Sequence, residues 1–279
     1  MISVVGLGNA ASSIAELFSS TPEYNVYRLA SKIKRGKNKK VLKDFIDPEE
    51  YEKNVPNLKN FFKDIDDEVQ FFIVGSSMSS NYALGVLEQI KNKNINIFYI
   101  KPDTDLLAGI PKLVERAAFG VLQQYARSGL FKSMTIISNE NIEKILENNS
   151  IKNYYNTLNK TFFSTVHYMN YFKHNEPELG VQTNPSEVCR IKSLGALDME
   201  NLEEKWFFNL DNSRDLCYYL NINKGRLESD GTLHKKYVSI LKKKPRNAFR
   251  NISYSIYETE LENDFGFCVA HTNAIQENT

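Results

Sequence analysis

The chain has 279 residues, 42% of them hydrophobic and 25% charged, and its 35 Lys and Arg residues against 34 Asp and Glu residues give a net charge of +1. This is the composition of a globular protein with one large or two modest domains, and the balanced charge argues against general nucleic-acid binding, which depends on an excess of Lys and Arg. No stretch reaches the roughly 18 consecutive apolar residues of a membrane span, and the sequence opens on a strand pattern in place of a signal peptide, so we expect a cytoplasmic protein without a membrane span.

The first half of the sequence alternates apolar runs with helical patterns. Apolar runs predict strands over residues 2–5, 25–30, 70–74, 95–100 and 134–137. Helical spacing of apolar residues predicts helices over residues 10–18, 47–67, 82–91, 111–128 and 141–147. Because parallel strands need crossover connections, this alternation predicts an α/β domain with a parallel sheet over residues 1–150.

The second half has a different pattern. Aromatic and apolar residues at helical spacing predict a long helix over residues 151–173, within a central segment that runs to residue 177. Strand patterns follow at residues 205–210, 216–222, 252–259 and 266–270, together with a basic helix at 232–244. Residues 178–279 are therefore expected to form a smaller α+β domain.

The first candidate site is the turn Gly6-Leu7-Gly8-Asn9-Ala10-Ala11, which opens a helix. Glycines let a backbone approach a phosphate, and a helix N-terminus supplies free N–H groups. A dinucleotide site also needs an acidic residue after the second strand. The sequence has Ser31 and Lys32 there, which argues against NAD, although Lys32 and Lys34 could meet a 2′-phosphate. The basic stretch 31–40 is typical of an exposed loop and could also bind anions.

The second candidate site follows the buried strand at residues 70–74. Small residues form this loop: Gly75, Ser76, Ser77, Met78, Ser79, Ser80 and Asn81. Two such loops at the carboxyl ends of separate strands suit a polyphosphate better than either loop does alone. An equally simple interpretation is that Ser79 or Ser80 caps a helix that begins at Tyr82. A third strand ends in the same way, at Ser138 and Asn139.

Other common sites are not indicated by the sequence. The P-loop pattern of nucleoside triphosphatases is missing. The histidines at 167, 174, 234 and 271 lack the spacing of metal ligands, so no metal site is expected and they are interpreted as core or surface residues. The cysteines at 189, 217 and 268 are interpreted as ordinary reduced thiols.

The order of the loops resembles the tubulin/FtsZ family of GTP-binding, filament-forming proteins over most of the chain. The opening VVGLGNAASS looks like the first phosphate loop of that family, and FFIVGSSMSSNYALGVLEQIKNK is similar to its buried strand, signature loop and following helix. The stretch from IFYIKPDTD to TIISNENIEKIL matches the next part of the family in layout. The resemblance implies a nucleotide-binding domain, a central helix and a smaller C-terminal domain.

The resemblance also implies particular residue roles. GTP or GDP, with Mg²⁺ where needed, would have its phosphates near Gly6, Gly8, Asn9, Ala10 and Ser12 and its base near Asn139. The signature loop would be Gly75 to Ser80, although only Gly75 remains of the family's Gly-Gly-Gly-Thr-Gly-Ser/Thr pattern. Subunits would associate head to tail, and an unidentified adaptor or cargo would bind the assembly, as in the family members carried by phages or plasmids.

The catalytic loop of the family, Asn-x-Asp-x-x-Asp, corresponds to residues 182–187. Asn184 and Glu187 then stand at the positions of the family's two carboxylates. Asn184 cannot serve as a carboxylate, and Glu187 has one extra methylene. Since water activation tolerates little displacement, we expect weak, altered or absent hydrolysis of GTP.

Three hypotheses follow from the sequence. The leading one is a divergent tubulin/FtsZ-like protein that binds GTP and forms filaments. The second is a Rossmann-type oxidoreductase that uses a nicotinamide cofactor bound at residues 6–11. The third is a tubulin-like fold that has lost nucleotide binding and acts through protein contacts, for which the degenerate loop at residues 75–81 is the best support.

Overall fold

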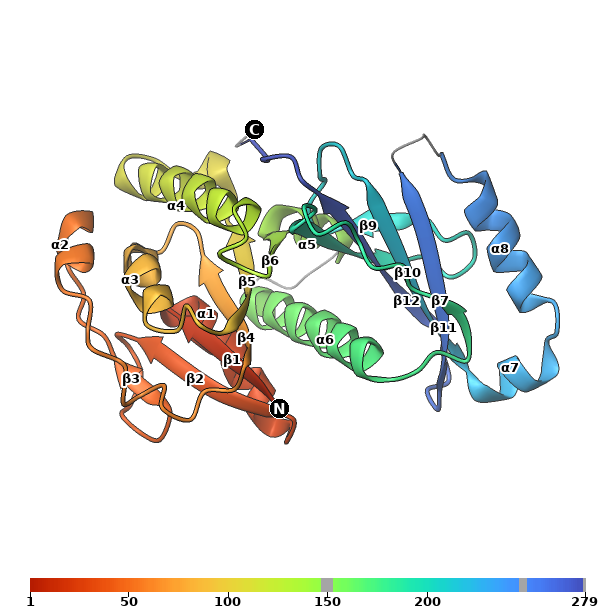
Figure 1. The fold of residues 1–279 in the computed structure, drawn as a ribbon, viewed down its shortest axis with the longest axis horizontal. Coiled ribbons are helices and arrows are strands. Elements are labelled where there is room, and N and C mark those ends of the chain that lie inside the picture. Colours follow the sequence, from red (N-terminus) through yellow and green to blue (C-terminus); the bar gives the residue numbers. More distant parts are fainter. Residues whose placement is uncertain (147–152, 246–249, 278–279) are drawn as a thin grey trace. The chain divides into compact units, whose positions relative to one another are not determined.

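The computed structural model describes residues 1–146, 153–245 and 250–277, which fold into two compact units (Figure 1). The first unit contains residues 1–163 and 275–279, and the second contains residues 164–274. Helix α6 (Tyr154–His174) begins in the first unit and ends in the second. No helix in the described part of the chain is both long and apolar enough to cross a membrane.

A parallel sheet forms the centre of the first unit, with strand order β3-β2-β1-β4-β5-β6. Its strands are β1 (Ile2–Leu7), β2 (Tyr24–Ala30), β3 (Lys39–Val41), β4 (Glu68–Val74), β5 (Asn94–Lys101) and β6 (Ser133–Ser138). The connecting helices are α1 (Asn9–Leu17), α2 (Pro48–Lys53), α3 (Ala83–Glu88), α4 (Ile110–Arg127) and α5 (Asn139–Ile145), with short 3₁₀ helices η1 (Phe18–Ser20), η2 (Met78–Tyr82) and η3 (Thr104–Leu106). The predicted α/β class is confirmed.

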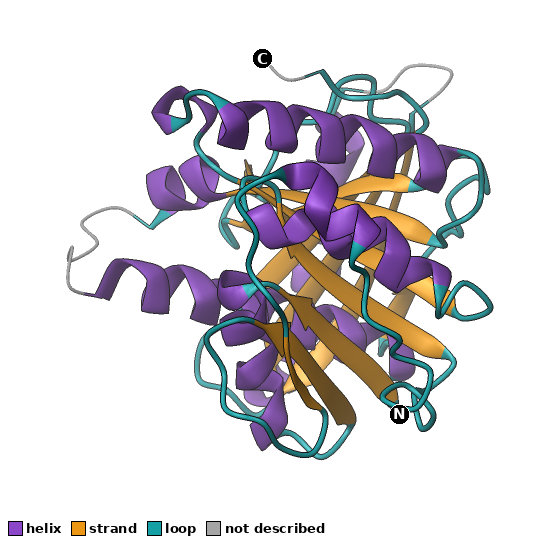
Figure 2. Cartoon of the chain, turned by 90° about the vertical axis from the view of Figure 1, so that its left-hand side faces the viewer, coloured by secondary structure: helices purple, strands orange, loops and turns teal. Residues whose placement is uncertain are grey.

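Helices cover both faces of this sheet (Figure 2). On one face Phe72 of β4 stacks on Phe98 of β5 at 4.8 Å, and Phe18 of η1 packs on Phe72 at 5.7 Å. Tyr99 follows Phe98 and therefore points to the opposite face, where it packs on Phe119 of α4 at 5.3 Å. Burial on two faces explains why these strands are continuous apolar runs.

The second unit contains a mixed sheet with strand order β8-β12-β10-β11-β7 and with β9 beside β8. Its strands are β7 (Leu179–Val181), β8 (Ile191–Leu197), β9 (Glu204–Trp206), β10 (Asp215–Asn223), β11 (Asn251–Thr259) and β12 (Phe265–Thr272). Helices α7 (Lys224–Ser229) and α8 (Leu233–Lys243) connect β10 to β11. The strands β10 and β11 are parallel, which is why a helical crossover joins them.

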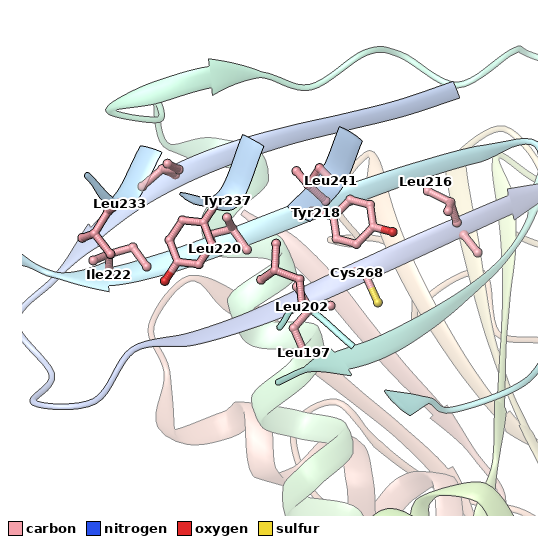
Figure 3. Close-up of a cluster of buried hydrophobic side chains, with 12 residues drawn as sticks. Leu197, Leu202, Leu216, Tyr218, Leu220, Ile222, Leu233, Tyr237, Leu241 and Cys268 are labelled. Carbon is pink, nitrogen blue, oxygen red and sulfur yellow. The ribbon is translucent and has the colours of Figure 1, made fainter. Parts of the chain in front are cut away.

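Alternate residues of β10 face two different layers. Tyr218, Leu220 and Ile222 belong to a buried apolar cluster with Leu233, Tyr237 and Leu241 of α8 (Figure 3). On the other face, Tyr219 stacks on Phe172 near the C-terminal end of α6 at 5.4 Å. Both faces of the sheet are therefore covered.

The helix predicted over residues 47–67 is wrong. Only Pro48–Lys53 is helical, because Asn54 ends α2 and Pro56 disfavours the helical conformation at the residue before it. Phe62 and Ile65 are nevertheless buried and Phe61 is half-buried, since the chain folds back in turns against the sheet.

Several boundaries also differ from the prediction. The strand predicted over residues 205–210 contains only β9, which ends at Trp206. The helix predicted from Tyr82 is divided into η2 and the short α3. The sequence patterns did not predict β3, β7, β8 or α7. The predicted ends at residues 147 and 151 lie outside the described residues.

Candidate functional site

The carboxyl ends of the parallel strands bring the predicted loops to one edge of the first unit. Leu7, at the end of β1, lies in register with Leu29 of β2 and Ile73 of β4. Lys101, at the end of β5, lies in register with Ser138 of β6. The loops that follow these strands are therefore neighbours, as expected of a ligand site in such a sheet.

The first loop has the geometry of an anion-binding turn. Gly8 precedes α1 with φ of 90°, in the left-handed region that favours glycine, and its N–H donates to the Leu29 carbonyl at 2.7 Å. No side chain caps α1, and Asn9 and Ala10 in its first turn are exposed. The unpaired N–H groups and the dipole of this turn suit a phosphate.

Gly6, Ser12 and Asn9 hold this turn in place. A Cβ at Gly6 would lie 2.6 Å from the Ala11 carbonyl oxygen, and the buried Ser12 hydroxyl donates to the Gly6 carbonyl at 3.0 Å. The side chain of Asn9 donates to the Ser31 hydroxyl at 3.2 Å and accepts from the Lys32 N–H at 2.9 Å. These bonds connect the first loop to the end of β2.

The second loop packs directly on the first. A Cβ at Gly8 would lie 2.4 Å from the Ser79 hydroxyl and 3.1 Å from the Ser77 hydroxyl, and these two hydroxyls are 2.7 Å apart. Ser76 and Met78 of the same loop are half-buried. The loop therefore places two hydroxyl groups beside the glycine of the first turn.

The second loop folds into η2 instead of a glycine-rich turn. Among the described residues only Asn38, Leu202 and Asn212 are non-glycine residues with positive φ, so none of the serines requires a glycine conformation. Ser79 and Ser80 lie inside η2, and the following helix α3 has Tyr82 as its N-cap and no side-chain capping hydrogen bond. The prediction that Ser79 or Ser80 caps the helix after this loop is therefore wrong. Ser80 is 4% exposed and its hydroxyl has no hydrogen-bond partner among the described residues.

Gly75 allows the second loop to pass over a buried tyrosine. Its N–H donates to the Ile100 carbonyl at 3.0 Å, and a Cβ there would lie 2.1 Å from the Tyr99 hydroxyl oxygen. That hydroxyl donates to Glu115 Oε1 at 3.3 Å. Burial raises the pKa of Glu115, and the charge of Lys101 opposes this rise.

Lys101 is a site residue that the sequence reasoning missed. It is 6% exposed at the carboxyl end of β5, and its ammonium lies 5.6 Å from the centre of the Phe119 ring. The signal was present, because Lys101 and Pro102 directly follow the apolar run. Lys101 is thus a buried cation at the carboxyl end of β5, the strand next to β4, which the second loop follows.

Asn139 begins α5 at the same edge. Ser138 caps this helix by accepting from the Asn141 N–H at 3.4 Å. The Asn139 side chain is half-buried, and within the described chain its carboxamide has no hydrogen-bond partner. It can therefore both donate and accept hydrogen bonds with a ligand.

Asn184 and Glu187 lie in the second unit, in the loop between β7 and β8. The first and second loops described above belong to the first unit. Both side chains are exposed. Gln182 anchors the start of this loop, because its amide donates to the Tyr218 carbonyl at 2.8 Å and to the Ser255 hydroxyl at 2.7 Å.

The histidines and cysteines of the described residues do not form a metal site. In the described ranges, no group of three or more His, Cys, Asp and Glu residues is arranged to hold a metal ion. All three cysteines are buried and free. His174 and His234 are exposed, and the other two histidines are half-buried.

We predict that Gly8→Ala destabilises the protein by about 2 kcal/mol, because the new Cβ meets the Ser79 hydroxyl and the positive φ strains an alanine. Urea unfolding measures this loss. Gly120→Ala is the matched control, since Gly120 lies inside α4 with open space around its Cα, and it should be neutral or stabilising by up to about 1 kcal/mol. Equal losses in the two variants would contradict the prediction.

Comparison with known proteins finds similarity in structure alone. No family model matches the sequence, and no curated protein matches it. The structure is similar to an FtsZ dimer from M. jannaschii, with a TM-score of 0.69 and 13% identity over 97% of this chain and 88% of that one. It is also similar to GDP-form protofilaments of TubZ from Bacillus thuringiensis serovar israelensis, with a TM-score of 0.73 and 12% identity over 97% and 83% of the two chains.

The GDP-bound monomer of CetZ1 from Haloferax volcanii is similar as well, with a TM-score of 0.70 and 11% identity over 98% of this chain and 94% of that one. The chain therefore has the FtsZ/tubulin fold, and the resemblance read from the order of its loops is confirmed at the level of the fold.

Proposed function

We propose that this protein is a divergent tubulin-like protein that binds GTP or GDP at the edge formed by its first and second loops and self-associates head to tail. The observation that carries the proposal is the contact between Gly8 and the hydroxyls of Ser77 and Ser79, at the carboxyl edge of a parallel sheet with the FtsZ/tubulin fold. This edge combines an uncapped helix N-terminus with hydroxyl donors, as a polyphosphate requires.

Each element of the edge has a distinct role in the proposal. The first turn of α1, with Asn9 and Ala10, donates backbone N–H groups to the phosphates, and Lys101 adds positive charge nearby. Ser77 and Ser79 exchange their mutual hydrogen bond for bonds to phosphate oxygens. The free carboxamide of Asn139 contacts the base. Mg²⁺ would arrive with the phosphates, because the described residues contain no metal-binding cluster.

Hydrolysis is proposed to be weak or lost. In the tubulin/FtsZ family the loop that corresponds to residues 182–187 completes the site of a neighbouring subunit, and here it carries Asn184 and Glu187. A carboxamide does not accept a proton from water at neutral pH, so only Glu187 could orient or activate the attacking water. Its longer side chain alters the distance to the phosphate, and such a displacement is costly.

Self-association is supported by the solved relatives in structure, which include an FtsZ dimer and TubZ protofilaments. A head-to-tail contact joins two different surfaces of the subunit, so it repeats along a filament unless it closes into a ring. In this proposal the loop of residues 182–187 of one subunit meets the nucleotide of the next subunit at their shared contact.

Nucleotide binding is tested by unfolding the protein in the presence of GTP, GDP, ATP, NAD or NADP, each with Mg²⁺. A ligand at about 100 times its Kd should add roughly 2.7 kcal/mol of stability. Guanine nucleotides alone should stabilise the protein, and Asn139→Ala should reduce this effect, whereas Asn141→Ala, two residues along α5, should not. Stabilisation by a dinucleotide alone would favour the oxidoreductase, and no stabilisation would favour a fold that has lost its ligand.

The catalytic role is tested separately, by Glu187→Gln. This variant should bind guanine nucleotide and sediment as assemblies like the unchanged protein, but it should release no phosphate from GTP. Phosphate release at the unchanged rate would show that Glu187 has no part in water activation.

A further inference from the structure

A pocket with a volume of about 550 Å³ lies in the second unit, lined by residues from the C-terminal end of α6 and the end of β11. Both elements are labelled in Figure 1. Four carboxylates line it: Glu176, Glu178, Glu258 and Glu260. Among the described lining residues there is no lysine or arginine, and His167 is the only basic side chain. The pocket is therefore strongly acidic, and its residues are different from those of the first and second loops, which form the proposed nucleotide-binding edge (the nucleotide edge).

Three of these four carboxylates are unneutralised by contacts within the described chain. Glu258 pairs with Lys224 at 3.3 Å, whereas Glu176, Glu178 and Glu260 have no ion-pair partner within 4 Å in the ranges that the structure describes. The hydrogen bond to Glu258 and the charges of Glu258 and Glu260 raise the pKa of Lys224. A cation beside this pocket is thus stabilised.

The floor of the pocket contains a buried acceptor without a donor. Asn221 lines the pocket with 3% of its surface exposed, and its side-chain oxygen has no hydrogen-bond partner among the described residues. Buried polar atoms rarely lack a hydrogen-bond partner, so a ligand that donates a hydrogen bond would complete this pocket. The acidic rim independently favours a ligand with positive charge.

The walls of the pocket add aromatic faces. Tyr168 and Tyr171 of α6 and Tyr257 of β11 line it. The Tyr257 hydroxyl donates to the Phe172 carbonyl at 3.0 Å, which fixes this ring in place. Carboxylates, an unpaired acceptor and aromatic faces together match an ammonium or guanidinium group, which donates hydrogen bonds and is attracted to ring faces.

The same chain carries exposed groups of this chemistry. The loop that precedes β3 contains Lys32, Lys34, Arg35 and Lys37, all exposed and without an ion pair in the described part of the chain. We propose that this pocket accepts a lysine or arginine side chain from the basic loop of residues 31–40 of a second copy of the chain. The inference rests on the self-association proposed above and assigns the surfaces that carry it.

The contact joins two different surfaces, so it is heterologous and propagates from copy to copy. Opposite charges on the two surfaces accelerate the encounter and fix its register more than they add affinity. Exposed lysines also resist unwanted association through repulsion between like surfaces, so the pairing is directional. Screening by salt should weaken it, because the rim of the pocket is open to solvent.

The pocket is tested first with a fluorescently labelled peptide of residues 31–40 and the full-length protein at a concentration where it is monomeric. The peptide should bind the unchanged protein and bind Glu176→Gln/Glu260→Gln at least about tenfold more weakly. The matched control is Glu23→Gln/Glu52→Gln, which removes two exposed carboxylates outside the pocket and should leave binding unchanged. No binding, or equal loss in both double variants, overturns the proposal.

The source of the cation is tested by mixing two variants. One carries serine in place of Lys32, Lys34, Arg35 and Lys37, and the other carries Glu176→Gln/Glu258→Gln/Glu260→Gln. Each alone should sediment as smaller species than the unchanged protein with GTP, and their mixture should form pairs through the intact loop of one and the intact pocket of the other. A mixture that forms no pairs overturns the contact with a second copy.

The outcomes separate this inference from the proposed function. If the unchanged protein assembles with GTP but the peptide does not bind, the pocket has no such role and the proposed function stands. If the unchanged protein remains a monomer with every nucleotide, self-association and the second copy as the source are both overturned. Stabilisation by guanine nucleotide should be the same in the pocket variants as in the unchanged protein, because the pocket lies outside the nucleotide edge.

Discussion

Lowering the pH from 7 to 4 should reduce the free energy of unfolding by about 3 kcal/mol through His271 alone. Burial, followed by the positive charge of Lys192, lowers the pKa of His271 to about 3, although a hydrogen bond to the backbone of Cys189 acts in the opposite direction. In the unfolded chain a histidine has a pKa of about 6.5. The unfolded state therefore binds a proton that the folded state does not accept.

The sign of the effect follows from this difference. Because the folded pKa is the lower one, the full contribution to stability is present above about pH 6.5 and is lost as the pH falls toward about 3. Each pH unit in this window costs about 1.4 kcal/mol. Two charged residues lie opposite His271 in the sheet register, Lys192 on β8 and Asp215 on β10. The strand pairing therefore fixes the charges beside the ring.

Urea unfolding of the unchanged protein and of His271→Gln, measured from pH 7 to pH 4, isolates the contribution. Over this range the unchanged protein should lose about 3 kcal/mol more of its free energy of unfolding than His271→Gln does, since glutamine does not titrate. His174→Gln is the matched control for the substitution itself, because it replaces an exposed histidine at the end of α6. Parallel curves for the unchanged protein and His271→Gln would refute the assignment.

The first unit could be predicted from sequence because its signals are local. Strands buried on two faces are continuous apolar runs, and Gly8 directly precedes the helix that it opens. The failures have local causes too. The short strand β7 has three residues, two of them exposed, so it carries no hydrophobic pattern, and the turns before Ile65 bury apolar residues at a spacing that imitates a helix.

The candidate site could be predicted only in part. The position of the second loop followed from the strand before it, but the contact of Ser79 with Gly8 depends on how two distant segments pack. The same is true of Gly75, whose neighbours Tyr99 and Glu115 come from β5 and α4. The sequence indicated a glycine of a phosphate loop, whereas the structure also gives it a packing role that spacing alone does not reveal.

Replacing Gly75 with valine should destabilise the protein by about 3 kcal/mol, at the upper end for an overpacked core position. A Cβ at this position would lie 2.1 Å from the Tyr99 hydroxyl oxygen and 3.1 Å from Glu115 Cγ, and both neighbours are buried. The loop must therefore move away from β5 or displace Tyr99. Urea unfolding measures the loss, and the displaced loop should also bind guanine nucleotide more weakly.

A double-variant cycle with Tyr99→Leu separates this packing role from a role in phosphate binding. If the clash with Tyr99 causes the loss, Gly75→Val should be less costly in the Tyr99→Leu background than in the unchanged protein, by about 1 kcal/mol or more. If nucleotide binding returns together with stability, Gly75 acts by positioning Ser77 and Ser79. Additive losses would instead show that Tyr99 is not the obstacle, because independent sites add.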